Sequence, residues 1–103
     1  MVTEQLQKCV EACEKCEDGC IKCADDCARM GLVAGERICR ECAKVCHECL
    51  ATMRTGSNED CDHCSEVCER TAIFCDYHPG QEHFRRCGDL CHHCADECHR
   101  MAA

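Results

Sequence analysis

Cysteines recur along this chain at intervals of three and four residues, the spacing of one face of an α-helix. The first series is Cys9, Cys13, Cys16, Cys20, Cys23 and Cys27, with steps of 4, 3, 4, 3 and 4 residues. Three more series follow: Cys39, Cys42, Cys46 and Cys49; Cys61, Cys64, Cys68 and Cys75; Cys87, Cys91, Cys94 and Cys98. Only Thr71 interrupts the third series, and the intervening positions are mostly charged. The pattern therefore predicts four helices, each with one face of cysteine.

Glycine and proline divide the chain at residues 31–35, 55–58 and 78–80. The segments between them, 3–30, 35–54, 58–77 and 81–101, are rich in helix-forming residues. We expect Asn58 to cap the third helix and Pro79 to end it. Because loops this short join antiparallel neighbours, the chain predicts an all-α, up-down-up-down antiparallel four-helix bundle with a cysteine-lined core. One domain covers residues 1–103.

Cysteine accounts for 18 of the 103 residues, whereas Leu, Ile, Val and Phe together number 14. That aliphatic content is below what a globular core normally contains. Reduced cysteine behaves as a small, readily buried hydrophobic residue, so the thiols can supply the missing interior. A core selected only for stability would use leucine, which buries more apolar area at about 25 cal/mol per Å². The cysteines are therefore expected to have a chemical function in addition to packing.

The net charge is −8, and the Lys and Arg residues are scattered rather than clustered. This excludes the basic surface typical of nucleic-acid binding. The opening MVTEQLQKCV lacks the charged and apolar regions of a signal peptide, and no segment has the length needed to span a bilayer. We expect a cytoplasmic protein with no membrane partner. Thiols are kept reduced there, which favours metal binding over disulfides.

Seven cysteine pairs are four residues apart on one helical face, which allows both sulfurs of a pair to bind one ion. Soft thiolates select Cu(I), zinc or iron–sulfur clusters. One Cu⁺ replaces one thiol proton and leaves the core neutral, whereas a four-thiolate zinc site leaves two negative charges in a dry interior. The sequence therefore favours multiple Cu(I) ions, on the order of 18 per chain if bridging thiolates each serve about two ions.

Three alternatives remain at this stage. A zinc or thiol buffer would use the same cysteines. An iron–sulfur electron-transfer protein is the second, although the compact ferredoxin run of cysteines is missing. The third is a redox enzyme using CxxC, but such a site needs a strand-and-helix context that the pattern does not predict. No other catalytic set stands out, so we expect a protein that is not an enzyme.

Methionine and histidine residues are predicted to lie near the ends of the cysteine faces. Met30, His78 and His83, with Phe84, fall at one end of the bundle, and Leu6, Met53 and Met101 at the other. Thioether and imidazole are weaker, neutral ligands for Cu(I), so these Met and His residues are candidates for passing copper to the thiolates. At the Met53 and Met101 end, simple hydrophobic plugging is an equal alternative. The other five histidines fall outside the cysteine faces and are expected on the surface.

The segments CVEACEKCEDGCIKCADDC, CRECAKVCHEC, CDHCSEVC and CGDLCHHCADEC resemble those of the bacterial four-helix-bundle copper storage proteins. The resemblance extends over the whole chain. It implies many Cu(I) ions inside each bundle, a homotetramer, and a role in storing copper or limiting its toxicity. The absence of a signal peptide resembles the cytosolic branch of that family. A copper chaperone is a candidate partner for exchange of the metal. Thr71 and Phe84 depart from the family's pattern.

Overall fold

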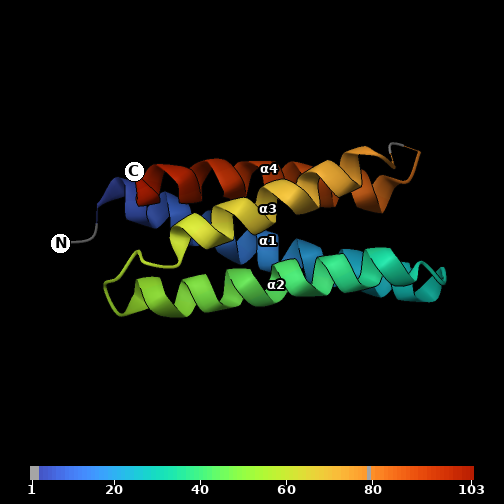
Figure 1. The fold of residues 1–103 in the computed structure, drawn as a ribbon, viewed down its shortest axis with the longest axis horizontal. Coiled ribbons are helices and arrows are strands. Elements are labelled where there is room, and N and C mark those ends of the chain that lie inside the picture. The colour runs from blue at the N-terminus through green and yellow to red at the C-terminus, as the bar shows by residue number, and fades with distance from the viewer. Residues whose placement is uncertain (1–2, 79) are drawn as a thin grey trace.

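Four antiparallel helices make up the fold in a computed structural model, which describes residues 3–78 and 80–103. They are α1 (Glu4–Arg29), α2 (Val33–Arg54), α3 (Cys61–Asp76) and α4 (Glu82–Ala102). The helices lie along the long axis of a bundle measuring 44 × 19 × 17 Å, and α1 begins at the end where α4 finishes (Figure 1). The predicted all-α, up-down-up-down bundle is confirmed.

The turn between α1 and α2 is tighter than the sequence predicted. Gly31 has φ of +73°, a left-handed conformation that glycine adopts at low cost, and the Leu32 amide donates to the Cys27 carbonyl at 2.8 Å. The second helix then begins at Val33, two residues before the predicted start. Gly35 was wrongly placed in the loop. It lies inside α2, where a Cβ atom would come within 3.0 Å of the Phe84 ring. The close packing of α2 against Phe84 of α4 therefore favours glycine at this position.

The third helix begins later than predicted, at Cys61 rather than at residue 58. The side chain of Asn58 does not cap it. Its Nδ2 donates instead to the carbonyl of Met101 at 2.8 Å, which joins the α2–α3 loop to the last turn of α4. A local capping signal was thus overridden by a tertiary hydrogen bond. The prediction for Pro79 lies outside the described residues, and α3 ends at Asp76.

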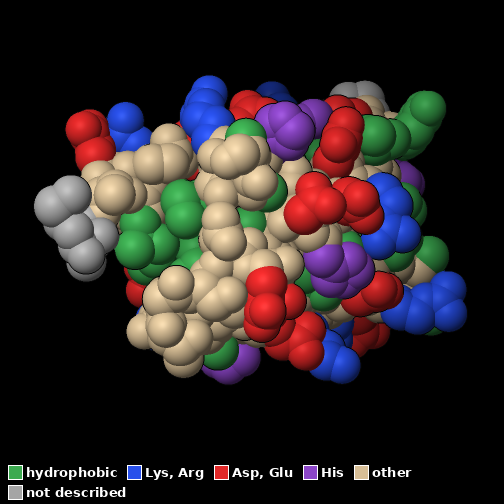
Figure 2. Space-filling view, turned by 60° about the vertical axis from the view of Figure 1, so that its left-hand side comes forward, with side chains coloured by type: hydrophobic (Ala, Val, Ile, Leu, Met, Phe, Trp, Pro, Cys, Tyr) green, Lys and Arg blue, Asp and Glu red, His purple; other side chains and the backbone are tan. Residues whose placement is uncertain are grey.

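Cysteine side chains make up most of the buried core. All 18 cysteines are buried, alanine is the commonest of the other core residues, and Phe84 and Leu50 are the largest fully buried side chains. In the view of Figure 2, charged and histidine side chains gather mainly on the right-hand half of the surface, and hydrophobic side chains are visible on the left-hand half. None of the four described helices combines the length and apolar character that a membrane crossing requires. The predicted cysteine-lined core is therefore present in the folded chain.

Candidate metal centre

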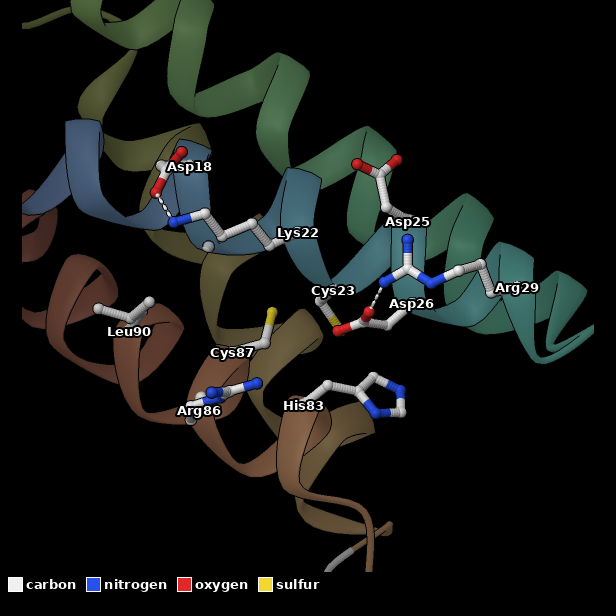
Figure 3. A pocket seen from close by; sticks show the side chains of 11 residues that line it. Asp18, Lys22, Cys23, Asp25, Asp26, Arg29, His83, Arg86, Cys87 and Leu90 are labelled. Carbon is white, nitrogen blue, oxygen red and sulfur yellow. Dashed lines mark hydrogen bonds and ion pairs between the residues drawn. The ribbon is translucent and has the colours of Figure 1, made fainter.

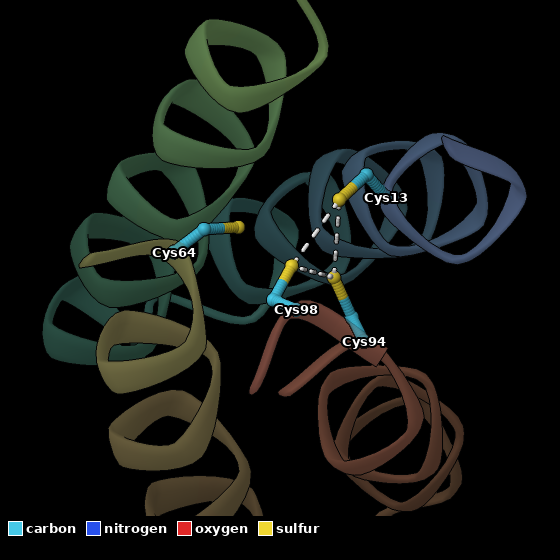
Figure 4. Close-up of side chains that lie close together, drawn as sticks. All are labelled: Cys13, Cys64, Cys94 and Cys98. Carbon is cyan, nitrogen blue, oxygen red and sulfur yellow. Dashed lines mark hydrogen bonds between the residues drawn. The ribbon is translucent and has the colours of Figure 1, made fainter. Parts of the chain in front are cut away.

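The four cysteine faces meet along the axis of the bundle, so thiols from different helices come into contact. Near one end, the sulfur of Cys13 in α1 lies 3.5 Å from that of Cys98 and 3.6 Å from that of Cys94, both in α4. Cys64 of α3 faces the same point (Figure 4). Thiols remote in sequence thus form one cluster.

The middle of the core has the highest density of thiol contacts. The sulfur of Cys68 lies 3.7 Å from that of Cys46, 3.8 Å from that of Cys42 and 3.9 Å from that of Cys16. Cys16 in turn reaches Cys91 of α4 at 3.7 Å. All four helices therefore contribute sulfur to one connected set. A metal ion bound to Cys68 can be shared with several neighbouring thiols.

Several groups of thiols have all their sulfur atoms within 4.8 Å of one another. They include Cys13, Cys64, Cys94 and Cys98; Cys16, Cys20, Cys42 and Cys91; Cys16, Cys42, Cys46 and Cys68; Cys46, Cys64, Cys68 and Cys94; and Cys23, Cys39 and Cys87. The groups overlap, since six of these cysteines belong to two groups each. Overlapping ligand sets suit metal ions that are bridged by shared thiolates better than isolated four-coordinate sites.

The helical spacing contributes contacts of its own. Four of the seven predicted CxxxC pairs have sulfur–sulfur distances of 3.9 Å: Cys16 with Cys20, Cys64 with Cys68, Cys87 with Cys91, and Cys94 with Cys98. The first pair instead meets through a second helix, α4, since Cys9 and Cys13 of α1 both contact Cys98, at 3.7 and 3.5 Å. Sequence spacing therefore identified pairs, while the packing of the helices decided which of them join into clusters.

Burial and mutual hydrogen bonding set the protonation of the thiols. Burial raises the pKa of the Cys27 thiol to about 12, since a thiolate there would lose its solvation. Cys39 donates a hydrogen bond to Cys23 at 3.4 Å, which lowers the pKa of Cys23 and raises that of Cys39. Metal binding at such sites must displace protons, so the affinity for metal depends on pH.

An aromatic cluster closes the end of the bundle where α4 begins. Phe84 is 1% exposed, and its ring centroid lies 4.4 Å from that of His83, 4.7 Å from that of His78 and 5.7 Å from that of Phe74. The Nε2 atom of His83 lies 3.7 Å from the sulfur of Cys27, so this histidine borders the thiol core. His78 donates from Nδ1 to the Phe74 carbonyl at 2.9 Å, which leaves its Nε2 lone pair free for a ligand.

Met30 lies at this end, as predicted, but it is exposed in the turn rather than packed against the core. Its side chain is 53% exposed, because α1 ends at Arg29 and Met30 caps the helix in the turn. At the opposite end Met53 is buried, and Leu6 and Met101 pack partly buried against the core, as expected. The five remaining histidines are exposed, which confirms their predicted surface positions. They are His47, His63, His92, His93 and His99.

A cavity of about 550 Å³ between α1 and α4 was not predicted from the sequence. Its wall includes the thiols of Cys23 and Cys87 together with His83, and charged side chains such as Asp26 and Arg86 surround it (Figure 3). These charged residues resemble any others on a solvated helix face. Only the separation of two helices makes them part of a cavity, so no sequence signal could have identified them.

A helical bundle filled with reduced, mutually contacting thiols defines a metal–thiolate binding protein rather than a disulfide scaffold. The comparison with known families is more specific. The sequence model of the family described as "Copper storage protein" matches residues 2–103, and the chain belongs to that family.

Similar proteins include both solved structures and a protein known from its sequence. The Cu(I)-bound copper storage protein BsCsp3 superposes with a TM-score of 0.88 at 32% identity, covering 97% of this chain and all of that one. The apo form of copper storage protein 3 from Bacillus subtilis gives 0.87 at 34% identity, with 94% and 98% covered. A protein from Nitrosospira multiformis gives 0.86 at 29%, with 96% and 95% covered.

The uncharacterized cysteine-rich protein YhjQ of Bacillus subtilis is 33% identical to this chain over 70 residues. That match includes 65% of this chain and 64% of the relative, so the aligned part spans just under two thirds of the relative's length.

Proposed function

We propose that this protein stores Cu(I) as thiolate complexes throughout its core, with a capacity on the order of one ion per cysteine, or about 18 per chain. The observation that carries the proposal is the continuity of the thiol core. Sulfur atoms from all four helices lie 3.4 to 4.0 Å apart in overlapping groups. The similar BsCsp3 structure is described as Cu(I)-bound, which supports the same cargo here.

Charge balance explains how so many ions fit into a buried space. Each Cu⁺ that binds a thiolate replaces one proton, so the interior stays neutral as it fills, and no uncompensated charge is buried. Zinc in four-thiolate sites would bury two negative charges per ion. Because Cys16 and Cys42 belong to two of the thiol groups, separate tetrahedral zinc sites could not occupy all the groups at once.

An anaerobic titration of the fully reduced protein against a Cu(I) chelator tests the storage function. Binding should saturate at about 18 Cu(I) per chain, with ultraviolet absorption and no visible colour. Zn(II) in a parallel titration should saturate at about a quarter of that number, since each ion takes four thiolates. Saturation at one or two Cu(I) ions would refute the proposal.

The same proposal assigns ligands at the ends of the core. All 18 cysteines are the thiolate ligands. His83 is the outermost ligand at the aromatic end, since its Nε2 borders Cys27. His78, Met53 and Met101 are accessory ligands through a free imidazole nitrogen or a thioether. Met30, exposed in the turn after α1, is the candidate ligand that meets copper at the surface. Alanine variants of His83 and Met53 should each bind slightly less Cu(I), and an unchanged capacity would remove that residue from the ligand set.

We also propose that the protein acts in the cytoplasm, without catalysis, as a homotetramer that exchanges copper with a chaperone. Reduced thiols require a reducing compartment. Apolar side chains on the surface support self-association, since Ile21 is 41%, Ile73 47% and Val33 73% exposed. Light scattering on the purified protein should give the mass of four chains, and a monomer at all concentrations would contradict the assembly.

A further inference from the structure

We propose that Cu(I) enters and leaves the core sideways, through the cavity between α1 and α4, rather than through an end of the bundle (Figure 3). This inference rests on the proposed storage function and assigns it a route. The cavity is a transfer site for Cu(I) presented as a thiolate complex, and the first thiols to receive the ion are Cys23 of α1 and Cys87 of α4.

Two thiols of the core lie in the wall of this cavity and keep a trace of exposure to solvent. Cys23 and Cys87 are each 2% exposed, whereas the other sixteen cysteines are 0 or 1% exposed. Both lie in the wall of the 550 Å³ cavity, which is large enough to admit a small coordination complex. Cys23 and Cys87 also belong to one thiol group with Cys39, so an ion that arrives here is already at the edge of the connected core.

Packing of α4 explains why the cavity forms at this place. Gly88 of α4 faces α3. A Cβ atom added to Gly88 would lie 3.1 Å from the Cys75 side chain and 3.8 Å from the Ala72 carbonyl oxygen. With this close approach, α4 packs more extensively against α3 than against α1. The helices α1 and α4 touch closely at Gly19, where a Cβ atom would lie 2.4 Å from Leu90. Between that contact and His83, the space between the two helices stays open.

Both ends of the bundle offer a poorer path to the thiols. The end where α4 begins is closed by the stacked rings around Phe84, which is itself 1% exposed. The opposite end has a cavity of about 410 Å³ bordered by Leu6, Met53 and Met101. Within the described part of the chain, the wall of that cavity includes no thiol. The lateral cavity is the place where open space and thiol meet.

Flexible ion pairs border the lateral cavity. Lys22 pairs with Asp18 at 2.9 Å, and Arg29 pairs with Asp26, with both basic side chains largely exposed. Exposed pairs of this kind contribute little to stability, so they can separate when a ligand approaches. The cavity therefore opens without any change in the packing of the core.

The transfer is a ligand exchange without oxidation or reduction. A Cu(I) ion bound to an incoming thiolate forms a bond to the Cys23 sulfur, and its bond to the incoming thiolate breaks. The proton of the Cys23 thiol passes to the departing thiolate, so a thiol leaves and the total charge is unchanged. Cys87 and Cys39 then take the ion inward by the same exchange.

Blocking the opening tests the route. The exposed Arg86 lines the cavity, whereas its neighbour Arg85 does not, so Arg86→Trp and Arg85→Trp form a matched pair. Each reduced apo-protein is mixed with Cu(I) as its coloured bicinchoninate complex, and loss of colour is followed over time. Arg86→Trp should load about tenfold more slowly, equivalent to about 1.4 kcal/mol in the barrier, and reach the wild-type capacity. Arg85→Trp should load at the wild-type rate.

The outcomes separate the route from the storage function. If Arg86→Trp loads at the wild-type rate, or if both variants slow equally, the lateral route is overturned while storage stands. If wild-type protein saturates at one or two ions, storage itself fails, whatever the rates.

Limited alkylation of the wild-type protein tests the route without any substitution. A substoichiometric amount of N-ethylmaleimide, added to the reduced apo-protein and followed by peptide mass spectrometry, should label Cys23 and Cys87 first. Copper loading should protect the same two thiols. Prior labelling of Cys9 or Cys61 would place the opening at the other end and overturn the route.

Discussion

At the scale of single residues, each cysteine serves both as a packing residue and as a ligand. The thiol is small enough to let four helices approach until their sulfur atoms are 3.4 to 4.0 Å apart, and apolar enough to be buried without a separate hydrogen-bond partner. Cysteines differ, however, in how many thiols they contact. This difference predicts unequal contributions to copper capacity.

Removal of a highly connected thiol should cost more copper than removal of a peripheral one. Within 4.0 Å, the sulfur of Cys68 contacts four other thiols, whereas that of Cys61 contacts Cys49, at 3.8 Å. We expect Cys68→Ala to lower capacity by about two Cu(I) ions and Cys61→Ala by about one, since bridging ligands serve two ions. Each variant should lose about 1 kcal/mol of apo stability through the small cavity created. Anaerobic titration measures the first effect and urea unfolding the second. Equal losses of copper would argue against bridging.

Thr71 occupies a cysteine position in α3 and should accept a thiol. It is 2% exposed, and its hydroxyl donates to the Val67 carbonyl of its own helix at 2.8 Å. We expect Thr71→Cys to raise the capacity by about one Cu(I) ion, because the new sulfur fills the gap between Cys68 and Cys75 on the same helical face. Thr71→Val is the matched control and should leave the stoichiometry unchanged. A capacity for Thr71→Cys equal to that of wild type would mean that this position points away from the ligand set.

At the scale of helices, small residues set how closely neighbouring elements approach. Gly35 allows α2 to pack against Cys27 and Phe84, and Gly88 allows α4 to pack against α3. The first contact holds the aromatic cluster in place over the end of the core. Helix spacing, and with it the sulfur–sulfur distances, therefore depends on residues that bind no metal.

Gly35→Ala should destabilise the apo-protein although alanine is the better helix former. The new methyl group would lie 2.8 Å from the Cys27 sulfur and 3.0 Å from the Phe84 ring. Overpacking costs typically 1–3 kcal/mol, and the gain in helix propensity returns about 1 kcal/mol, so a net loss of about 1 kcal/mol is expected. Chemical unfolding of the reduced protein measures it. Gly80→Ala, where nothing lies within 4 Å of the new atom, should be close to neutral. Stabilisation by Gly35→Ala would show that the helices separate without cost.

At the scale of the whole molecule, the bundle encloses its thiols along its full length. Each thiol can exchange its proton for Cu⁺ without a change in the net charge of the core. The thiols are shielded along a 44 Å axis, and the charged side chains lie outside, with Glu97 as the buried exception among the described residues. A protonated thiol is neutral and can be buried at low cost, whereas a thiolate without a metal ion loses its solvation in the core. Stability of the apo-protein should therefore depend on pH in the alkaline range.

Apo stability should fall as pH rises above 9. Burial raises the pKa of Cys27 to about 12 from its ordinary value of 9.0. Between these values the unfolded chain releases the proton and the folded chain keeps it, so the contribution present below pH 9.0 is lost as pH approaches about 12. Urea unfolding at about pH 8 and about pH 10.5 measures the decline. Cys27→Ser should show a shallower decline, and a midpoint independent of pH would mean that Cys27 ionises inside the bundle.

The sequence by itself determined the number of helices, their antiparallel order and the cysteine faces that line the core. The reason is that the 3.6-residue period is local, and it repeats in every segment with charged residues opposite. Boundaries were less certain, as Gly35 and Asn58 show, because glycine and asparagine serve turns and tertiary contacts equally well. The first helix ends at Arg29, one residue before the predicted end, which leaves Met30 exposed in the turn.

Only the tertiary structure decided which thiols share a cluster, such as Cys13 of α1 with Cys94 and Cys98 of α4, and where the core opens. Both depend on how far apart the helices lie and how they are rotated about their axes. Those quantities arise from contacts such as Gly88 against α3 and Phe84 against Gly35, between residues far apart in the chain. A heptad pattern places a side chain on the inner face of its helix but leaves its partners and its distance from solvent to be set by packing.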